Sequence, residues 1–394
     1  MNAPSPTAAA ANSRGVAALQ TGRFQDAVAA FGEACAADPT SGALLRNLAS
    51  AQRALGDDTG ELASLEGALN LDRRDLVAWM RKAELHQKLE EKGEALTAWN
   101  AALQLAEPLQ PWSGPLKEVL DRGLAFRATA MADMRAASDA VLAPLVAELD
   151  QTSRRRSAAF VDMALGNRNR FFNECAGLYY PFLPADEFFD DRHFPWFQAF
   201  AAKTDTIRDE LLALLADPGE QLRPYVRMEA GTPDSKWSEL DHKLSWGACF
   251  LWEYGEPNRA VLERCPATAQ ALAAIPQSHI PGRAPSAFFS ILQPHTRIPA
   301  HTGVTNTRAI VHLPLIVPEG CGFRVGGETR EWVVGKPFAF DDTIEHEAWN
   351  ESGELRAVLI CDVWNPHLSS GEQELIARYY EAADRTGYNP ARTA

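Results

Sequence analysis

Two histidines, His301 and His346, lie 45 residues apart, each beside a run of β-branched and aromatic residues. Arg356 follows the second histidine by ten residues. Imidazole is a good ligand for Fe(II), zinc and copper, and the planar guanidinium of an arginine pairs well with a carboxylate. A metal beside a cation suits a co-substrate that carries two carboxylates. The pattern therefore predicts a non-haem iron oxygenase that uses 2-oxoglutarate.

One residue departs from the usual ligand set of such enzymes. The facial triad combines two histidines with one carboxylate, in the order His-x-Asp/Glu and then a distant His, and here Gly303 stands at the carboxylate position. A missing carboxylate leaves the metal more positively charged, with one position open to water. Asp342, four residues before His346, is the candidate to hold that water as an outer partner of the metal.

Short motifs surround these residues between about 285 and 368. They are His301-Thr302-Gly303-Val304-Thr305-Asn306, His312-Leu313, Glu319-Gly320-Cys321, Glu328-Thr329-Arg330, Phe340-Asp341-Asp342, Glu345-His346-Glu347, Trp349 and Asp362-Val363-Trp364-Asn365-Pro366. Together they resemble the aspartyl/asparaginyl β-hydroxylase family, and a weaker resemblance begins at about 170. The family also occurs with tetratricopeptide repeats ahead of the oxygenase domain.

The resemblance implies a specific set of ligands. His301 and His346 are then the only protein ligands to Fe(II), and Gly303 is a family trait. Dioxygen and 2-oxoglutarate complete the set as co-substrates. Arg356 pairs with the far carboxylate of 2-oxoglutarate.

Three further residues take roles by the same resemblance. Ser290 donates a hydrogen bond to the far carboxylate, Trp246 lines the pocket, and His312 touches the metal-proximal carboxylate.

The sequence also departs from the family at one cation. A second arginine usually stands nine residues after the first histidine, and this chain has Ile310 there. Arg308 lies two residues earlier, so in a strand it faces the same side, about 7 Å away. Arg308 is therefore the first candidate to replace the missing arginine, followed by Arg324 and Arg330.

The elements around these residues are short and rich in β-forming residues. We expect His301 to precede a strand and His346 to begin one, both at the mouth of a barrel. Spacing of this kind predicts a double-sheet jelly roll, a cupin-like double-stranded β-helix, within a domain of residues 169–394 that includes flanking helices. The expected strands are 247–254, 287–293, 307–317, 322–325, 330–334, 336–340 and 355–364.

The N-terminal part has a different period. Phe31, Leu65 and Trp99 recur every 34 residues, each followed three positions later by an alanine, and this is the period of tetratricopeptide helical hairpins. We expect such repeats over 13–110, after a disordered 1–12 and before a helical capping region over 111–168. The fold class is thus α+β and multidomain, an α-solenoid followed by the β domain. An ordinary helical bundle is the alternative for the repeats.

Composition narrows the partners and the compartment. The net charge of −14 argues against nucleic acid, which needs a concentrated basic face. The first residues lack an apolar signal region, and no stretch of about 18 apolar residues predicts a membrane span. The six cysteines are scattered without paired spacing, as in a reduced, cytoplasmic protein.

These observations favour hydroxylation of an unactivated C–H bond. By resemblance the target is the β-carbon of an Asp or Asn residue, and a concave helical surface suits a peptide or protein substrate. A small-molecule or lipid substrate is an alternative. So are a metal-dependent hydrolase on a cupin-like barrel and an interaction protein whose oxygenase-like barrel is inactive.

Overall fold

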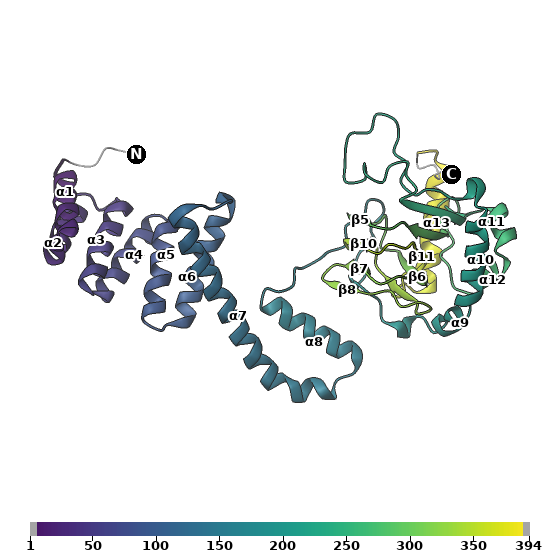
Figure 1. The fold of residues 1–394 in the computed structure, drawn as a ribbon, viewed down its shortest axis with the longest axis horizontal. Helices are drawn as coiled ribbons and strands as arrows, with labels where there is room; N and C mark the ends of the chain where they lie inside the picture. Colours follow the sequence, from purple (N-terminus) through teal and green to yellow (C-terminus); the bar gives the residue numbers. More distant parts are fainter. Residues whose placement is uncertain (1–5, 389–394) are drawn as a thin grey trace. The chain divides into compact units, whose positions relative to one another are not determined.

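The computed structural model describes residues 6–388 of the chain. The chain divides into two compact units, Met1–Asp150 and Gln151–Ala394, and Figure 1 shows a helical N-terminal unit and a C-terminal unit built on sheets.

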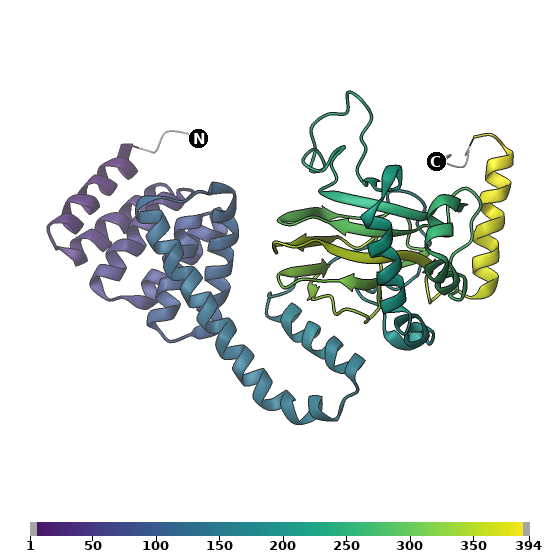
Figure 2. The same cartoon turned by 45° about the vertical axis from the view of Figure 1, so that its right-hand side comes forward.

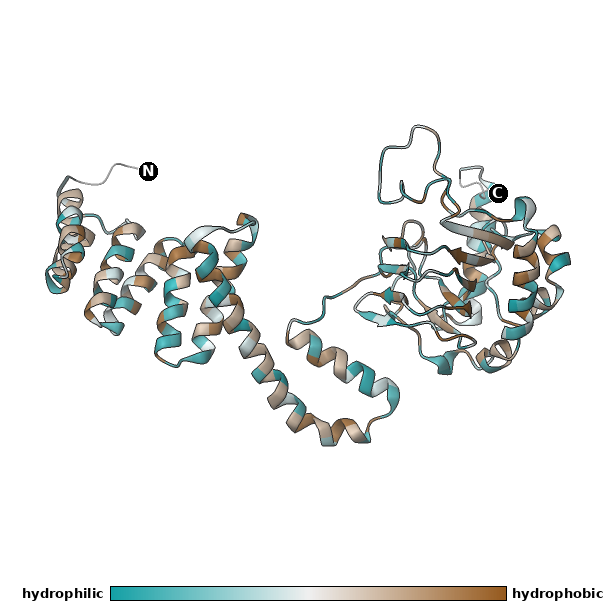
Figure 3. Cartoon of the chain, in the orientation of Figure 1, coloured by the Kyte–Doolittle hydropathy of each residue, from teal (hydrophilic) through white to brown (hydrophobic). Residues whose placement is uncertain are grey.

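The N-terminal unit is built from helical hairpins, as predicted from the 34-residue period. Gly22 and Gly56 lie in the left-handed region, with φ of 73° and 83°, which lets the chain turn sharply after a helix. Hydrophobic and hydrophilic residues alternate along these helices (Figure 3), as expected for helices buried on one face. The pairs are α1 (Pro6–Gln20) with α2 (Phe24–Ala37), α3 (Gly42–Leu55) with α4 (Asp58–Leu71), and α5 (Leu76–Lys88) with α6 (Lys92–Ala106).

The three large residues of the repeat lie on the second helix of each pair and are fully buried. Small residues on neighbouring helices make room for two of them. A Cβ placed on Gly15 would lie 2.6 Å from the Phe31 ring, and one on Gly123 would lie 2.4 Å from the Trp99 ring. The helices can therefore approach closely at these points because a side chain is missing.

The predicted disorder of residues 1–12 is wrong for the part that the structure describes, because α1 begins at Pro6. The alanine-rich segment that follows has the highest intrinsic helix propensity. Ala8 and Ala11 are buried against Ala34 and Leu44, so tertiary packing stabilises the helix.

The segment expected to cap the repeats forms two helices, α7 (Gly114–Glu148) and α8 (Gln151–Ala164). Leu120 of α7 packs into the same cluster as Trp99 of α6, so the start of α7 closes the last hairpin. The division between the compact units falls between α7 and α8.

The C-terminal unit contains two antiparallel sheets within the described residues. The major sheet has the order β1-β2-β4-β11-β6-β9, with β3 paired to β2, and the minor sheet has the order β5-β10-β7-β8. The strands of the major sheet are β1 (Arg223–Pro224), β2 (Trp246–Glu253), β3 (Glu256–Pro257), β4 (Ala287–Leu292), β6 (Arg308–Ile316), β9 (Phe338–Phe340) and β11 (Arg356–Trp364). The strands of the minor sheet are β5 (Thr296–His301), β7 (Cys321–Val325), β8 (Glu328–Arg330) and β10 (His346–Asn350).

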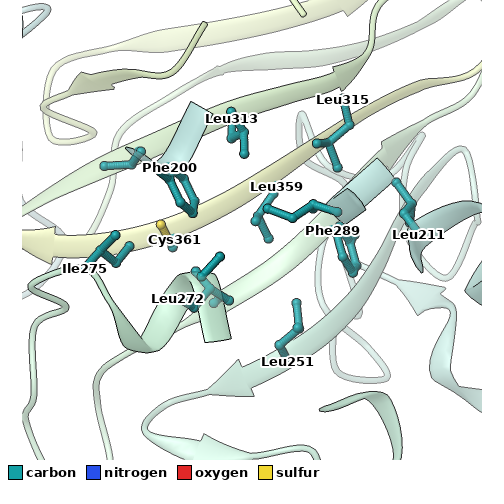
Figure 4. Close-up of a cluster of buried hydrophobic side chains, with 14 of the residues drawn as sticks. Phe200, Leu211, Leu251, Leu272, Ile275, Phe289, Leu313, Leu315, Leu359 and Cys361 are labelled. Atoms are coloured by element: carbon teal, nitrogen blue, oxygen red, sulfur yellow. The ribbon is translucent and has the colours of Figure 1, made fainter. Parts of the chain in front are cut away.

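One face of the major sheet is covered by helices, as Figures 1 and 4 show. Leu359 and Cys361 of β11 point toward this side and pack with Phe200, Leu211 and Leu272 of the helices. The covering helices are α9 (Phe197–Ala201), α10 (Thr204–Ala216), α11 (Arg259–Arg264) and α12 (Pro266–Ala273).

The opposite face of the major sheet packs against the minor sheet. Val358 and Phe340 of the major sheet share a buried cluster with Ile298, Phe323 and Ala348 of the minor sheet. Because side chains alternate along a strand, the residues of β11 with even numbers, from 356 to 362, face the space between the sheets.

The last helix, α13 (Ser370–Arg385), is drawn in yellow at the end of the chain in Figure 2. Ser369 and Glu372 form a capping box at its start, which satisfies free backbone N–H groups. Among the described helices, α13 included, none is both long and apolar enough to cross a membrane.

Candidate active site

His301 and His346 stand side by side on paired strands of the minor sheet. His301 is the last residue of β5 and His346 the first of β10, and the two are register partners. Their ring centroids are 4.1 Å apart. His346 begins a strand as predicted, but His301 ends one instead of preceding one. Strand β5 was missed because it contains Pro299, which is typical of an edge strand, and because its polar and apolar residues alternate only weakly.

Backbone carbonyls orient both imidazoles. Nδ1 of His301 lies 2.8 Å from the Pro299 carbonyl oxygen, and Nδ1 of His346 lies 3.0 Å from the Ile344 carbonyl oxygen. An Nδ1–H that donates to a carbonyl leaves Nε2 as the free lone pair, which is the usual arrangement of a metal-binding histidine.

The surroundings keep both rings neutral. Burial lowers the pKa of His301. Burial also holds the pKa of His346 well below its usual value, and the neighbouring His301 lowers it further. A neutral imidazole is the form that binds a metal, so the pair is ready to ligate at neutral pH.

Gly303 and Asp342 compete for the same space. The Gly303 N–H donates to the Asp342 carbonyl oxygen at 2.6 Å, and a Cβ on Gly303 would lie 2.1 Å from Oδ2 of Asp342. The Asp342 carboxylate therefore occupies the place where a side chain at position 303 would begin. Burial raises its pKa to about 7, against the opposing effect of Arg308.

No group of three or more His, Cys, Asp or Glu side chains is arranged to hold a metal ion anywhere in residues 6–388. The two imidazoles are thus the donors that this part of the chain brings together, and a metal between them would keep positions for ligands from outside the protein.

Arg356 is a buried cation at the start of β11, with only 2% of its surface exposed. Its Nη1 donates to the backbone oxygen and to Oγ of Ser290, both at 3.1 Å. Nε1 of Trp246 donates to the same Oγ at 3.1 Å. The guanidinium lies 4.7 Å from the centroid of Trp332.

Nothing in the described chain neutralises this charge. Arg356 forms no ion pair with a described acidic side chain, and its Nε is buried without a hydrogen-bond partner. Burial lowers its pKa to about 10. Leaving a charge buried and unpaired costs several kcal/mol, so the donors around Arg356 fit an anion such as a carboxylate.

His312 lies between this cation and the histidine pair. It projects from β6, and burial together with Arg356 holds its pKa well below the usual value. Nε1 of Trp332 lies 3.3 Å from its Nδ1. Trp332 thus contacts both Arg356 and His312, and sequence reasoning missed it because the tryptophan was assigned to an ordinary strand.

The three cations considered as replacements for the missing arginine have other partners. Arg308 pairs with Asp362 at 2.5 Å, and four residues along β6, about 13 Å, separate it from His312. Arg324 pairs with glutamates, and so does Arg330. The structure therefore does not place Arg308 with Arg356, although both arginines line the same cavity.

A cavity of about 510 Å³ is lined by both histidines, Asp342 and Arg356. Stacked aromatic rings form part of its wall. The ring centroids of Tyr225 and Trp246 are 3.9 Å apart, and those of Phe250 and Phe288 are 4.9 Å apart. Every predicted site residue lines it. They are His301, His346, Asp342, Arg356, Ser290, His312, Trp246 and Arg308.

A segment upstream of the sheets, the strap (residues 173–180), is hydrogen-bonded to the loops beside both histidines. Asn173 donates to Asp341 at 2.7 Å and to Thr343 at 2.9 Å, beside His346. The Ala176 N–H donates to the Gly303 oxygen at 3.1 Å, beside His301. Sequence reasoning did not find these contacts, because no sequence signal marks a hydrogen bond between distant segments.

The strap continues to Tyr180, which exchanges two hydrogen bonds with one side chain. The Tyr180 N–H donates to Oδ1 of Asn306 at 2.7 Å, and Nδ2 of Asn306 donates to the Tyr180 oxygen at 2.9 Å. Asn306 in the first motif is thus a positioning residue for the loop after His301.

Residues 201–366 match the family described as aspartyl/asparaginyl beta-hydroxylase. The human aspartyl/asparaginyl beta-hydroxylase is 37% identical over 131 residues, which are 33% of this chain and 17% of that protein. The ornithine lipid ester-linked acyl 2-hydroxylase of Rhizobium tropici is 33% identical over 196 residues, 49% of this chain and 66% of that protein. This chain thus spans only about a sixth of the length of its human relative.

Among solved structures, the TPR2B domain of yeast Sti1, in a complex with pHsp70, is 21% identical and covers 31% of this chain and 98% of that chain, with a TM-score of 0.28. So low a score supports no inference about a partner.

Proposed function

The C-terminal domain belongs to the aspartyl/asparaginyl β-hydroxylase family, and from this premise we propose that the protein is an Fe(II)- and 2-oxoglutarate-dependent dioxygenase. Its two sheets are assigned to a double-stranded β-helix, the jelly roll of such enzymes. The target is an unactivated C–H bond, in our proposal the β-carbon of an Asp or Asn residue of a peptide or protein.

One observation carries the proposal. A buried arginine without a counter-anion shares a cavity with two adjacent, neutral imidazoles whose Nδ1 atoms lie against backbone carbonyl oxygens. Zinc hydrolases generally bind their metal with three protein ligands, and an inactive barrel has no reason to retain an uncompensated buried charge. A two-histidine metal site next to an anion site fits 2-oxoglutarate better than either alternative.

Each residue of the cavity then has a defined task. The imidazoles of His301 and His346 would hold the ferrous ion. Arg356 binds the far carboxylate of 2-oxoglutarate, with Ser290 as its hydrogen-bonding neighbour. When bound, iron and 2-oxoglutarate supply the chemistry by which dioxygen and a C–H bond give an alcohol, succinate and carbon dioxide.

The remaining residues position the co-substrate and enclose the site. His312, neutral because it is buried, offers a hydrogen bond to the metal-proximal carboxylate, and Trp246 and Trp332 form the walls of the anion site. Asp342, whose carboxylate fills the space beside Gly303, accepts a hydrogen bond from water beside the histidines. Burial of the whole group excludes bulk water, which strengthens each of these polar interactions.

The helical hairpins support a polypeptide substrate, since repeats of this kind present extended surfaces. A lipid substrate is the second candidate, favoured by one finding: the aligned segment covers 66% of the acyl 2-hydroxylase but 17% of the human relative.

The proposal is tested by titrating the anaerobic protein with Fe(II) and then with 2-oxoglutarate. A weak visible metal-to-ligand charge-transfer band is expected, and it should be absent in His346→Ala. A protein that binds neither component, or a band that persists in His346→Ala, would rule the proposal out.

A further inference from the structure

The face of the major sheet that lines the cavity is polar at both ends and apolar between them. On β11 the residues Arg356, Ile360 and Asp362 face the cavity, and Asp362 is the register partner of Ile310 on β6. Ile310 and Ile360 form an apolar strip on this face. A second polar group, Arg308 with Asp362, follows it, and Asp362 is about 20 Å from Arg356 along the strand.

Arg308 is neutralised within the protein. Its Nη1 donates to Oδ2 of Asp362 at 2.5 Å, and the Asp362 side chain is only 2% exposed. The other carboxylate oxygen of Asp362 accepts hydrogen bonds from Ser278 Oγ and from the Ser286 N–H, both at 3.1 Å. These donors hold Asp362 in place as an acceptor, so its charge compensates that of Arg308.

A second carboxylate acts on the same guanidinium. Asp342 is close enough to Arg308 for each to influence the other electrostatically. This end of the cavity therefore holds one arginine beside two carboxyl groups, and Ile310 adds no charge. Arg227 also lines the cavity but is exposed to solvent, where water and salt screen its charge.

Two hydrogen-bonding atoms at this end have no partner. Nε of Arg308 is a buried donor and Oδ1 of Asp342 is a buried acceptor, and neither is hydrogen-bonded within residues 6–388. A primary carboxamide offers one acceptor oxygen and two N–H donors, so it can serve both. A carboxylate offers acceptors only, so it has no donor for Oδ1 of Asp342, and an acyl chain serves neither atom.

We propose that the side chain hydroxylated in this cavity ends in an uncharged carboxamide, which makes asparagine the substrate residue in preference to aspartate. The proposal rests on the function proposed above and defines its substrate class. Its basis is the juxtaposition of an internally paired Arg308 with a second carboxylate and with unfilled donor and acceptor atoms. A carboxylate on an aspartate side chain would leave Oδ1 of Asp342 without a donor.

The test uses two peptide libraries, with blocked termini, that are identical apart from Asn or Asp at the central position. The full-length protein with Fe(II) and 2-oxoglutarate is incubated with each library and with micelles of an ester-linked acyl lipid. Mass spectrometry then measures the fraction of each that gains one oxygen atom. We expect the Asn library to be hydroxylated at least about tenfold more than the Asp library.

Binding gives a readout that does not depend on turnover. Calorimetry with the metal-free protein compares the best Asn peptide with its Asp counterpart, and the Asn form should bind about tenfold more tightly. Ile310→Arg places a cation beside the second polar group and should reduce this ratio at least fivefold. Ile310→Met, which changes the shape of the side chain but not its charge, should leave the ratio within about twofold.

Each outcome bears on one of the two proposals. Equal or preferential use of Asp overturns the carboxamide proposal, as does oxidation of the acyl lipid alone. Consumption of 2-oxoglutarate without hydroxylation of either library also counts against it. If the protein binds neither Fe(II) nor 2-oxoglutarate, the dioxygenase function itself fails, and the charge-transfer titration identifies that case.

Discussion

The two arginines of the cavity differ in how their charge is compensated. Arg308 pairs with Asp362 inside the protein, whereas Arg356 has hydrogen bonds to Ser290 but no carboxylate among its described neighbours. Arg356 is buried and the Arg308 side chain is only 15% exposed, so each is stabilised by an anion. The comparison teaches that a compensated arginine is part of the fold, whereas an uncompensated arginine at a cavity indicates a ligand.

The largest effect should come from breaking the internal pair. Asp362→Ala leaves Arg308 buried without its counter-ion, so we expect the free energy of unfolding of the C-terminal unit to fall by about 3–5 kcal/mol. Denaturant unfolding measures it. Adding Arg308→Met should recover most of the loss. The control is Glu374→Ala, which removes an exposed pair with Arg378 and should cost less than about 1 kcal/mol. A similar loss in both single variants would contradict the comparison.

Removing Arg356, the arginine without a counter-ion, should weaken ligand binding without lowering stability. Arg356→Met removes a charge that lacks a partner, so stability without ligands should stay equal or rise. Affinity for 2-oxoglutarate should fall by a factor of about 30–150, because a charge-assisted hydrogen bond contributes roughly 2–3 kcal/mol. Calorimetry and thermal unfolding measure the two quantities, and Fe(II) affinity should change less than about threefold. Equal losses of iron and 2-oxoglutarate affinity would show that Arg356 has another role.

A substitution at Gly303 tests whether the space beside the two histidines can hold a further ligand. Gly303→Asp by itself places Cβ within 2.1 Å of the Asp342 carboxylate, so the substitution does not simply add a third ligand, as the sequence suggested. In an Asp342→Ala background the space is free, and Gly303→Asp should then raise Fe(II) affinity about tenfold over Asp342→Ala alone. Fluorescence-monitored metal titration checks this. An unchanged affinity would mean that position 303 does not face the metal.

The smallest effect is expected in the N-terminal unit, where Glu84 is shared by Arg53 and Arg122 and its side chain is 20% exposed. Burial would raise the pKa of Glu84, but the hydrogen bonds from both arginines outweigh it and the pKa is lowered. Its contribution is therefore present above the ordinary pKa of about 4.5 and is lost as pH falls through the lowered value. Glu84→Gln should cost about 0.5–1 kcal/mol at pH 7 and almost nothing at pH 3. A pH-independent loss in thermal unfolding would exclude this electrostatic explanation.

Much of the architecture could be predicted because it depends on local periodicity. The 34-residue recurrence of Phe31, Leu65 and Trp99 places one large residue on each second helix, and all three are buried there. Strand β5 could not be found in this way. Its residues alternate weakly and include Pro299, and it is a strand because it pairs with β10.

The sequence predicted the residues that line the candidate site but not all of the contacts between them. His301, His346 and Arg356 stand at the spacing that the motifs gave, and they line one cavity. Trp332 was overlooked although it contacts both Arg356 and His312. The contribution of Asn173 was also invisible, since its hydrogen bonds reach 168 and 170 residues along the chain.

The sequence by itself determined the helical period, the two imidazoles, the arginine ten residues beyond them and the replacement of an arginine by Ile310. These are properties of residue type and spacing, which need no knowledge of contacts. Only the tertiary structure decided that Arg308 pairs with Asp362, that Arg356 lacks a carboxylate, and that Asp342 fills the space beside Gly303. Such facts depend on which charges meet after distant strands have paired, because the energy of a buried charge is set by its neighbours in space and not by its neighbours in the chain.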